Sequence, residues 1–471
     1  MRGRKIIKPD NAEYIRMVMD HRAMHRKLAA VLFPGDEDKL KIRIHRAFPW
    51  SLPGKGVIEY EIIMREGLGH KTETKIINAH HNNAKKGPMK TLRAGSSPLT
   101  DSERELFLTG KKALALTDPP VILSTYPLDS RMSWLPDLMD TKSIGQLLER
   151  HLSDFLNGRS VSAVSGPALL GYRFGKRCTL KYDVRILGAE GEGPAEIQLI
   201  GKTYRDSRGR STFNNLQQLW NWSLSVAGTR PPVIPRPFCY VPEYRMCLRE
   251  SKKGFDLSEL KVREVRHELL SRVSEILSTF HASEVSVAGH FTLEDEISLL
   301  DRMSAYLPVV RPELEVMSRK MLDLIRRKAS SLRIKNYTPR ITHRDFHDKQ
   351  IIVGVNEMYL TDFDTVAMSD QTIDVGNFLA HIFLRSLQVG ESREEMLRDS
   401  YIFLSAYILH NPPADMEKIA FYRMTSLYRL ACLYAYRPSW KGLVVKLLEE
   451  CWNQAEHSGD YILDLHSRSE V

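Results

Sequence analysis

Apolar residues alternate with polar ones in the first half of this chain and follow helical spacing in most of the second half. Alternation over 40–78, 179–186 and 196–200 predicts strands with one buried face. Helical spacing occurs at 10–33, 142–155 and 212–227, and it dominates beyond Gly254. The later helices are predicted at 257–282, 293–307, 311–333, 374–388, 391–409, 414–436 and 441–457. Strands followed by helices predict an α+β fold.

Two local signals refine the N-terminal part of this pattern. Asp10 and Glu13 have the spacing of a capping box, so one helix is predicted from there to the Pro34–Gly35 break. Residues 79–118 are polar and mixed, and the run from His80 to Pro88 is predicted to be a loop.

The stretch 341–376 contains the clearest chemical pattern. Asp345 is followed by Gln350, then by two short apolar runs separated by a turn, and the second run ends at Asp362. A hairpin of this form brings all three residues to one end. One carboxylate can then orient an attacking hydroxyl and accept its proton, while the other and the amide oxygen hold Mg²⁺ on nucleotide phosphates.

The pattern His-x-Asp-x-x-x-x-Gln followed by Asp-Phe-Asp resembles the catalytic and metal loops of the protein-kinase-like superfamily. It is most similar to the aminoglycoside phosphotransferase and choline kinase branch, and residues 374–378 (DVGNF) extend the likeness. The resemblance covers roughly 165–440. It implies a two-lobed kinase-like fold, with a small antiparallel β lobe and a large helical lobe, after an N-terminal α/β extension. The regions are then 1–145, 146–255 and 256–471.

The resemblance implies a role for each residue of this stretch. Asp345 would be the catalytic base, and Asp362 the main Mg²⁺ ligand. Gln350 stands where the family usually has asparagine and offers the same oxygen on a longer side chain. His343 and Asp374 would support the loops rather than react.

Lys202 is the candidate for binding the α- and β-phosphates of ATP or GTP, because it follows an apolar strand and a glycine. The family's usual partner is a glutamate on the next helix, but 211–227 contains no acidic residue. Asp206 and the amides of Gln217 and Gln218 are the nearby candidates for a partner of Lys202 in place of that glutamate.

Other nucleotide contacts are predicted around the same sheet. The sequence has no Gly-x-Gly-x-x-Gly loop, and Lys176 and Arg177 lie in the turn where that loop is expected. Their cationic side chains can bind phosphate. Glu250 lies where the family recognises the base, and there the backbone is expected to make the contact.

The implied activity is phosphorylation of a small-molecule hydroxyl with ATP or GTP and Mg²⁺. Nine residues separate Asp364 from Asp374, too few for an ordinary activation segment, so a protein substrate is not expected. Residues 301–340 hold ten basic and four acidic side chains. That balance favours a neutral or acidic acceptor, such as a sugar, over a cationic aminoglycoside.

Charge and composition add limits. Residues 1–100 hold 20 Lys and Arg against 10 Asp and Glu, whereas the remainder holds 48 of each. The basic N-terminal region fits an acidic partner, although charge alone is weak support for nucleic acid. The five cysteines are scattered and no apolar run reaches about 18 residues, so a cytoplasmic protein without a membrane helix is expected.

Three alternatives remain open. Gln350 and the missing helix glutamate also suit a pseudokinase, a nucleotide-binding scaffold without turnover. His343, Asp345 and His347 have spacing that permits a metallohydrolase site. Finally, 54–62 resembles 175–184, so the N-terminal region is interpreted as a degenerate copy of the small lobe; chance similarity between two alternating hairpins explains the likeness equally well.

Overall fold

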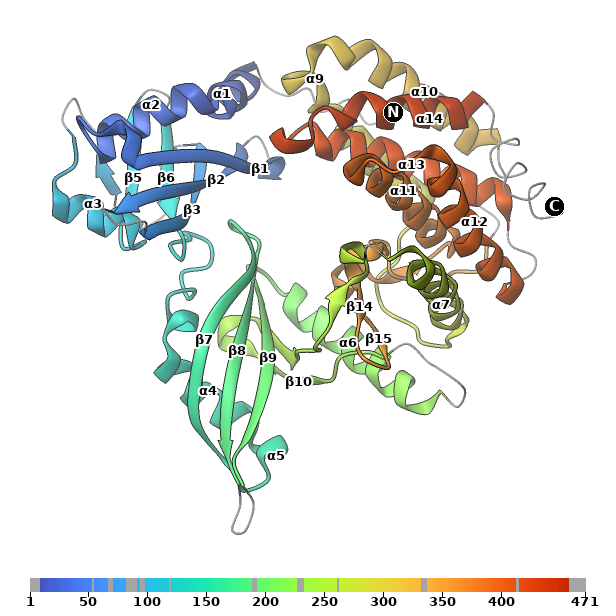
Figure 1. Cartoon of the computed structure of the whole chain (residues 1–471), viewed down its shortest axis with the longest axis horizontal. Coiled ribbons are helices and arrows are strands. Elements are labelled where there is room, and N and C mark those ends of the chain that lie inside the picture. Colours follow the sequence, from blue (N-terminus) through green and yellow to red (C-terminus); the bar gives the residue numbers. More distant parts are fainter. Residues whose placement is uncertain are drawn as a thin grey trace.

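Three parts follow one another along the chain in the computed structural model: an N-terminal α/β unit, a small β lobe and a helical lobe (Figure 1). The structure describes residues 9–52, 55–66, 71–81, 91–93, 98–117, 120–188, 193–226, 233–260, 262–331, 337–411 and 415–456. The predicted two-lobed α+β fold with an N-terminal extension is confirmed by this arrangement.

The N-terminal unit is a six-stranded sheet in the order β1-β2-β3-β6-β5-β4, with helices before and within it. Its helices are α1 (Pro9–Met19), α2 (His21–Leu32) and α3 (Asp101–Leu108). Its strands are β1 (Leu40–Leu52), β2 (Lys55–Glu66), β3 (Lys71–His81), β4 (Thr91–Arg93), β5 (Ala113–Thr117) and β6 (Pro120–Thr125).

Two predictions for this unit were wrong. The single helix predicted from residue 10 to 33 is two helices, because Asp20 caps α2 by accepting from the backbone N–H groups of Arg22 and Ala23. The predicted loop at His80 is the end of strand β3, where the imidazole stacks on Phe174 at a ring distance of 4.7 Å. Residues 82–90 of that predicted loop lie outside the described residues.

The two faces of the N-terminal sheet have different neighbours. Tyr60, Ile77 and Ala79 face the helices α1 and α2, and Tyr60 donates a hydrogen bond from its hydroxyl to the Val18 carbonyl. Val57 lies on the opposite face and packs into the core of the small lobe. The unit is therefore closed on one side by its own helices and on the other by the neighbouring lobe.

The small lobe is an antiparallel sheet in the order β10-β11-β9-β8-β7, with three helices. Its strands are β7 (Ser160–Arg173), β8 (Arg177–Leu187), β9 (Ala195–Tyr204), β10 (Pro237–Val241) and β11 (Met246–Glu250). Its helices are α4 (Thr141–His151), α5 (Ser153–Leu156) and α6 (Arg208–Ser225). The strand register places Lys202 between Thr179 on β8 and Cys247 on β11.

The helical lobe contains eight α-helices and five short strands among the described residues. The helices are α7 (Arg263–Ala282), α8 (Leu293–Ser304), α9 (Leu307–Val310), α10 (Glu315–Ser331), α11 (Thr372–Val389), α12 (Arg393–His410), α13 (Met416–Tyr434) and α14 (Leu443–Glu456). The strands are β12 (Phe255–Asp256), β13 (Arg340–Thr342), β14 (Ile351–Val353), β15 (Met358–Leu360) and β16 (Ala367–Ser369). Gly376 lets α11 and α13 pack closely, because a Cβ there would lie 2.5 Å from the Arg423 nitrogen.

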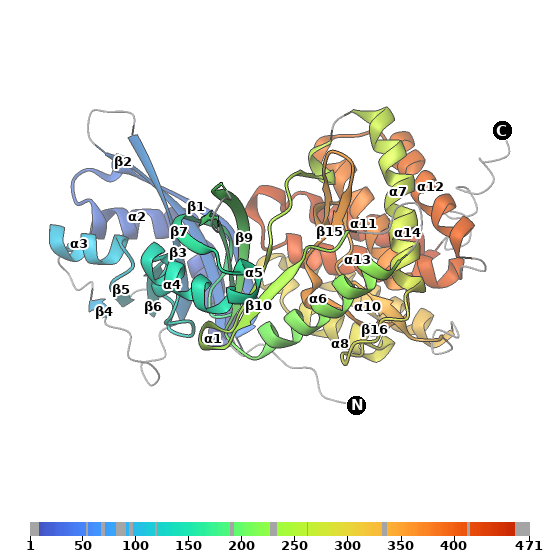
Figure 2. The same cartoon turned by 90° about the horizontal axis from the view of Figure 1, so that it is seen from below.

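Two hydrophobic cores hold these parts together. One is continuous through the N-terminal unit and the helical lobe, and the other lies in the small lobe. Arg16 donates to the Val309 carbonyl at 3.1 Å, and the Ala47 N–H donates to the Tyr436 carbonyl at 3.2 Å. Figures 1 and 2 show the N-terminal unit reaching the helical lobe beside the sheet of the small lobe. The small lobe packs mainly around its own core, and its residues Leu216, Leu219 and Cys247 join it to the larger one.

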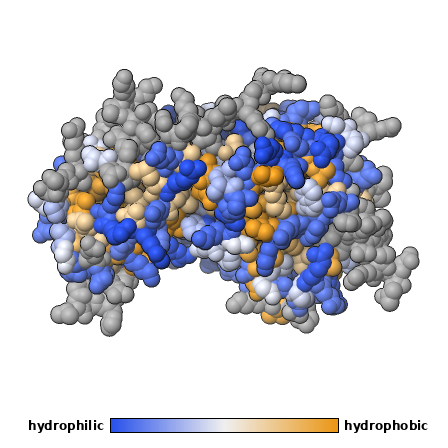
Figure 3. All heavy atoms as spheres, turned by 90° about the horizontal axis from the view of Figure 1, so that it is seen from above, coloured by the Kyte–Doolittle hydropathy of each residue, from blue (hydrophilic) through white to orange (hydrophobic). Residues whose placement is uncertain are grey.

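The surface mixes polar and apolar side chains. Figure 3 shows hydrophilic residues interspersed with smaller hydrophobic groups on the face seen from above. Within the described residues, no helix combines the length and apolar character needed to cross a membrane.

Candidate active site

A cleft of about 570 Å³ lies where the sheet of the small lobe meets the β14–β15 hairpin. Side chains of Ile200, Lys202, Cys247 and Arg249 line it from the sheet. The other wall includes residues at the end of the hairpin: Gln350, Thr361, Asp362, Phe363 and Asp364. The volume is in the range of small-molecule sites in proteins.

The hairpin predicted from the sequence brings Gln350 and Asp362 to the same end. Strands β14 and β15 pair Ile351 with Leu360, and the Thr361 N–H donates to the Gln350 carbonyl at 3.0 Å. Asp362 follows directly in a left-handed conformation, with φ of 63°. Such a conformation costs a non-glycine residue on the order of 1 kcal/mol and is frequent at functional sites.

Lys202 lies at the centre of a cluster of ion pairs. Its Nζ lies 2.7 Å from Asp362 Oδ1 and 2.8 Å from Asp364 Oδ1. Arg177 forms an ion pair with Asp364, and the Tyr204 hydroxyl donates to the same carboxylate at 2.6 Å. Asp364 is thus enclosed by donors, whereas Asp362 is the more exposed of the two carboxylates (25% against 11%).

Asp362 is held in its charged form. Burial alone would raise its pKa, but the nearby cations of Lys202 and Arg177 outweigh burial and keep the pKa well below the usual value. The carboxylate is therefore an anion at neutral pH and faces the cleft.

The acidic partner of Lys202 comes from the loop after β15 and not from helix α6. None of the three candidates from the sequence pairs with Lys202: Asp206 binds Arg208 at 2.7 Å, and the Gln217 amide donates to Asn221. Asp364 takes this role instead, 162 positions further along the chain. The second aspartate of the Asp-Phe-Asp motif was the available signal for it.

Asp374 ties the loop that follows β13 to the helical lobe. Its buried carboxylate accepts the backbone N–H groups of His343 and Arg344, each at 2.6 Å, and lies 3.0 Å from His281 Nε2. His343 is also buried, and its Nε2 lies 2.8 Å from the Thr361 carbonyl, next to Asp362. These contacts are what a supporting role requires. His281, on α7, was missed by the sequence interpretation because it lies far from the motif.

Asp345 lies in the loop between β13 and the short 3₁₀ helix Asp348–Gln350. Its side chain is 44% exposed, and its Oδ1 is 4.0 Å from His347 Nε2. His347 Nε2 in turn lies 3.2 Å from the Gln350 amide nitrogen. Asp345 is accessible from solvent, beside the residues that line the cleft.

The trio His343, Asp345 and His347 does not form a metal site. His343 Nε2 is engaged by the Thr361 carbonyl, and the three side chains are not found as a cluster of possible metal ligands among the described residues. The potential metal-binding group found among the described residues is instead His347, Asp348 and His381.

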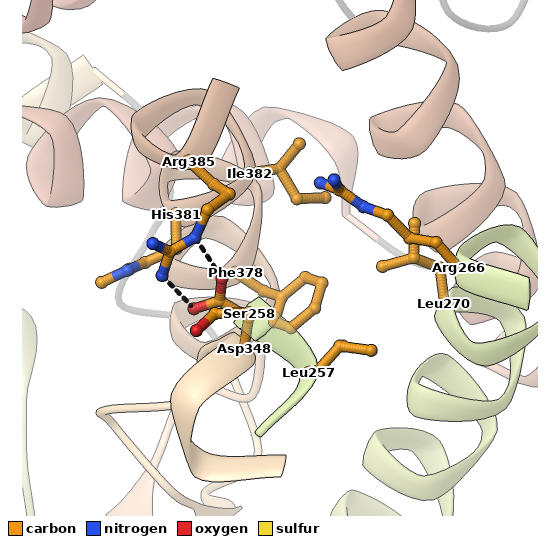
Figure 4. Close-up of a pocket in the computed structure, with 9 residues that line it drawn as sticks. All are labelled: Leu257, Ser258, Arg266, Leu270, Asp348, Phe378, His381, Ile382 and Arg385. Carbon is orange, nitrogen blue, oxygen red and sulfur yellow. Dashed lines mark hydrogen bonds and ion pairs between the residues drawn. The ribbon is translucent and has the colours of Figure 1, made fainter. Parts of the chain in front are cut away.

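The side chains of this second group already have partners within the protein. Arg385 binds the Asp348 carboxylate at 2.7 and 3.2 Å, as Figure 4 shows. His347 and His381 stack with an angle of 8° between their rings. Burial and the neighbouring His347 hold the pKa of His381 well below its usual value. The adjoining cavity is only about 20 Å³, so the group packs the hairpin on α11.

The turn between β7 and β8 carries Lys176 and Arg177 beside the cleft. Burial and the neighbouring guanidiniums, foremost Arg173 and Arg208, lower the pKa of Lys176 to about 7. Among the described residues, no carboxylate lies within ion-pair distance of Lys176. The turn therefore offers a concentrated positive charge next to Asp364.

Asp129, which the sequence interpretation missed, fixes this turn. The carboxylate accepts from the Tyr172 hydroxyl at 2.9 Å, the Gly175 N–H at 2.6 Å and the Arg131 N–H at 2.8 Å. Asp129 belongs to the segment that joins the N-terminal unit to the small lobe, far from the turn in sequence. No local pattern marks it.

The Glu250 side chain is not brought into the cleft. It contacts Lys252 at 2.8 Å and accepts from the Arg236 N–H at 3.3 Å, and it lines a separate hollow. The chain then crosses to the helical lobe through Gly254, where φ is 156° and a Cβ would lie 2.4 Å from the Val353 carbonyl oxygen. Neighbouring side chains of this segment, Arg249, Ser251 and Lys252, line the cleft instead of Glu250.

The residues at the hairpin end fit Mg²⁺. Asp362 presents a partly exposed carboxylate held in its charged form, and Gln350 offers an amide oxygen on the same wall. Hard oxygen donors in small number are what Mg²⁺ takes in nucleotide sites, where phosphates and water complete its shell.

Comparison with known proteins gives structural likeness alone. No family model matches the sequence, and no curated protein matches it. Among solved structures, the choline kinase LicA of Streptococcus pneumoniae is 17% identical, with a TM-score of 0.42 over 66% of this chain and 99% of its own. A choline kinase of Cryptosporidium parvum is 10% identical, with a TM-score of 0.47 over 67% and 96%. A spectinomycin phosphotransferase is 11% identical, with a TM-score of 0.41 over 66% and 94%.

Proposed function

We propose that this protein transfers the γ-phosphoryl group of ATP or GTP to a hydroxyl group of a small molecule. The observation that carries the proposal is the convergence of Lys202, Asp362 and Gln350 in one cleft between a β lobe and a helical lobe. A cation, a carboxylate and an amide oxygen at one point are the groups that phosphoryl transfer requires. Asp345, on the loop that leads to Gln350, supplies the fourth.

Asp345 orients the acceptor hydroxyl and takes its proton as the bond to phosphorus forms. Its exposure leaves room for a small acceptor outside the nucleotide cleft. Asp374 accepts the backbone N–H groups of His343 and Arg344, the two residues just before Asp345, so the carboxylate of Asp345 keeps its direction.

Lys202 binds the α- and β-phosphates, and Lys176 and Arg177 add positive charge from the β7–β8 turn. Asp362 and Gln350 would hold Mg²⁺, which neutralises charge on the β- and γ-phosphate oxygens when bound. Nucleotide binding would weaken the contact of Lys202 with Asp362, because the phosphates compete with that carboxylate for the ammonium group of Lys202. Asp364 would then remain as its fixed partner.

We also propose the division into 1–145, 146–255 and 256–471, with the first part a degenerate small-lobe-like unit. Its first three strands form a meander, and a later hairpin adds β6 beside β3, just as β11 lies beside β9. Ala79 is third from the end of β3, the position that Lys202 has in β9. The shared strand order supports the copy over chance similarity.

For the acceptor we propose a neutral or acidic small molecule such as a sugar. The support is the excess of basic residues over 301–340, which includes all of α10. An aminoglycoside acceptor is the alternative, and it would need acidic groups around Asp345.

The test is transfer of ³²P from γ-labelled ATP and GTP, with Mg²⁺, to a panel of sugars, polyols and aminoglycosides. The proposal expects a labelled product with at least one acceptor class, and loss of about 10²-fold or more of the rate in Asp345→Asn. Asp323→Asn, on the exposed face of α10, is the matched control. Transfer at an unchanged rate in Asp345→Asn would show that Asp345 is not the base.

The second candidate function is a nucleotide-binding scaffold without turnover. It is favoured by Gln350 in place of asparagine and by the absence of an acidic residue in α6. Asp364 weakens the second argument, because it gives Lys202 a carboxylate from elsewhere. Nucleotide binding without any labelled product across the panel would favour the scaffold.

A further inference from the structure

Arg249 brings a guanidinium group into the cleft where a nucleotide base would lie, and we propose that it makes the site selective for guanine over adenine nucleotides. This inference rests on the proposed function, because it assumes a purine nucleotide in the cleft. It goes further by naming the base and the residue that chooses it.

The strand register fixes the position of Arg249. On β11 it lies opposite Ile200, and Cys247 lies opposite Lys202. Because side chains alternate along a strand, these four residues share one face of the sheet, and all four line the cleft. Arg249 thus lies two residues along β11 from Cys247, the residue opposite Lys202. The direction is toward the segment that crosses to the helical lobe.

That position corresponds to the base and not to the phosphates. The ion pairs of Lys202 with Asp362 and of Arg177 with Asp364 define the phosphate end of the cleft. Arg249 has no ion pair with a carboxylate of the described residues. Its Nη1 donates instead to the carbonyl of Glu250 at 3.0 Å, on the backbone where the base edge is expected to bind.

The chemistry of this contact separates the two purines. A guanidinium has five N–H donors and no acceptor. Guanine presents two acceptors, O6 and N7, on the edge where adenine presents an amino donor beside N7. The Glu250 carbonyl, a natural acceptor for the adenine amino group, already accepts from Arg249. Guanine therefore gains Arg249 as a donor to its acceptors. The amino group of adenine instead meets the N–H donors of Arg249 and a Glu250 carbonyl that already accepts a hydrogen bond.

The guanidinium is also partly withdrawn from water, which strengthens this discrimination. Burial lowers the pKa of Arg249 from its ordinary value, and the group still remains charged at neutral pH. Hydrogen bonds to a charged donor are stronger than neutral ones, and they gain weight where water is scarce.

The test is equilibrium binding of Mg-GDP and Mg-ADP to the full chain, measured by calorimetry so that no acceptor is needed. Wild type is expected to bind GDP at least about tenfold more tightly than ADP. Arg249→Met removes the donors at similar size and brings the ratio close to one. Arg249→Gln supplies an amide that pairs with adenine, and it shifts the ratio toward ADP.

Arg185→Met is the control, because Arg185 is an exposed arginine on β8 that lies outside this cleft. It leaves the ratio unchanged, and melting curves establish that each variant is folded. Equal affinities in wild type, or a ratio that does not move in either Arg249 variant, would overturn the inference and leave the proposed function standing. Absence of binding by both nucleotides would overturn the proposed function as well.

Discussion

The two large sheets of this protein share a strand order but differ in what covers them. In each, three consecutive strands form a meander, and a hairpin adds its second strand beside the third: β1-β2-β3-β6-β5 in one and β7-β8-β9-β11-β10 in the other. Helices α1 and α2 close the corresponding face of the first sheet over Tyr60, Ile77 and Ala79. In the second sheet, Lys202 faces a cleft and two aspartates of the helical lobe.

The difference shows that the strand order fixes where a side chain lies in the sheet. The element that packs on that face then decides whether the side chain is part of a core or of a site. Ala79 and Lys202 have the same place in their strands, yet one is sealed in an apolar core and the other pairs with carboxylates. A lysine at Ala79 would be a buried charge without a partner, which is costly. The first unit therefore contributes packing, and the second contributes the site.

The largest expected effect concerns the frame under the second sheet, for which the first unit has no counterpart. Asp374→Ala leaves the buried N–H of His343, the partly buried N–H of Arg344 and His281 without their acceptor. We expect the free energy of unfolding to fall by about 3–5 kcal/mol in guanidinium denaturation. Asp323→Ala, on the exposed face of α10, should change it by less than about 0.5 kcal/mol. A loss below about 1 kcal/mol for Asp374→Ala would show that the frame is held elsewhere.

Replacing Lys202 tests the comparison at its centre. Lys202→Met removes the cation shared by Asp362 and Asp364, so kcat/KM for the nucleotide should fall by about 10²- to 10³-fold. Ser124→Ala is the matched change in the first unit, at a buried hydroxyl on β6 that has no hydrogen-bond partner among the described groups. It should leave kcat/KM within about twofold. A large loss in Ser124→Ala would mean that the first sheet takes part in catalysis.

The pH dependence of binding sharpens the role of the β7–β8 turn. Lys176, with a pKa of about 7, is charged below that pH and neutral above it. Nucleotide affinity should weaken by a few-fold as the pH rises from about 6 to about 8.5, and Lys176→Met should remove that slope. Since the folded pKa lies below the unfolded value, the same group makes the fold more stable as pH rises above 7. Identical slopes in wild type and Lys176→Met would exclude Lys176 from phosphate binding.

The smallest expected effect lies in the first unit. Asp20→Ala removes the cap of α2 and should lower the free energy of unfolding by about 1 kcal/mol, without changing nucleotide affinity. Asp20→Asn keeps an acceptor at the cap and should behave like wild type in both assays. A change in nucleotide affinity for Asp20→Ala would contradict a purely structural role for this unit.

Local patterns in the sequence predicted the elements well and their partners poorly. The helices beyond residue 260 and the 351–360 hairpin follow from apolar spacing and a turn, which are properties of neighbouring residues. The split at Asp20 was missed because one residue both ends α1 and caps α2. Asp364 as partner of Lys202, and Asp129 as anchor of the β7–β8 turn, join residues far apart in the chain, and no spacing rule encodes such contacts.

The most direct test of the account is the stoichiometry of Mg-nucleotide binding to the full chain, measured by calorimetry with GDP and ADP. The account predicts one nucleotide per chain, bound in the second sheet's cleft, and loss of binding in a double variant, Lys202→Met with Asp362→Asn. Two nucleotides per chain would show that the first sheet is also a site. One nucleotide that stays bound to the double variant would show that the cleft between the lobes is not where it binds.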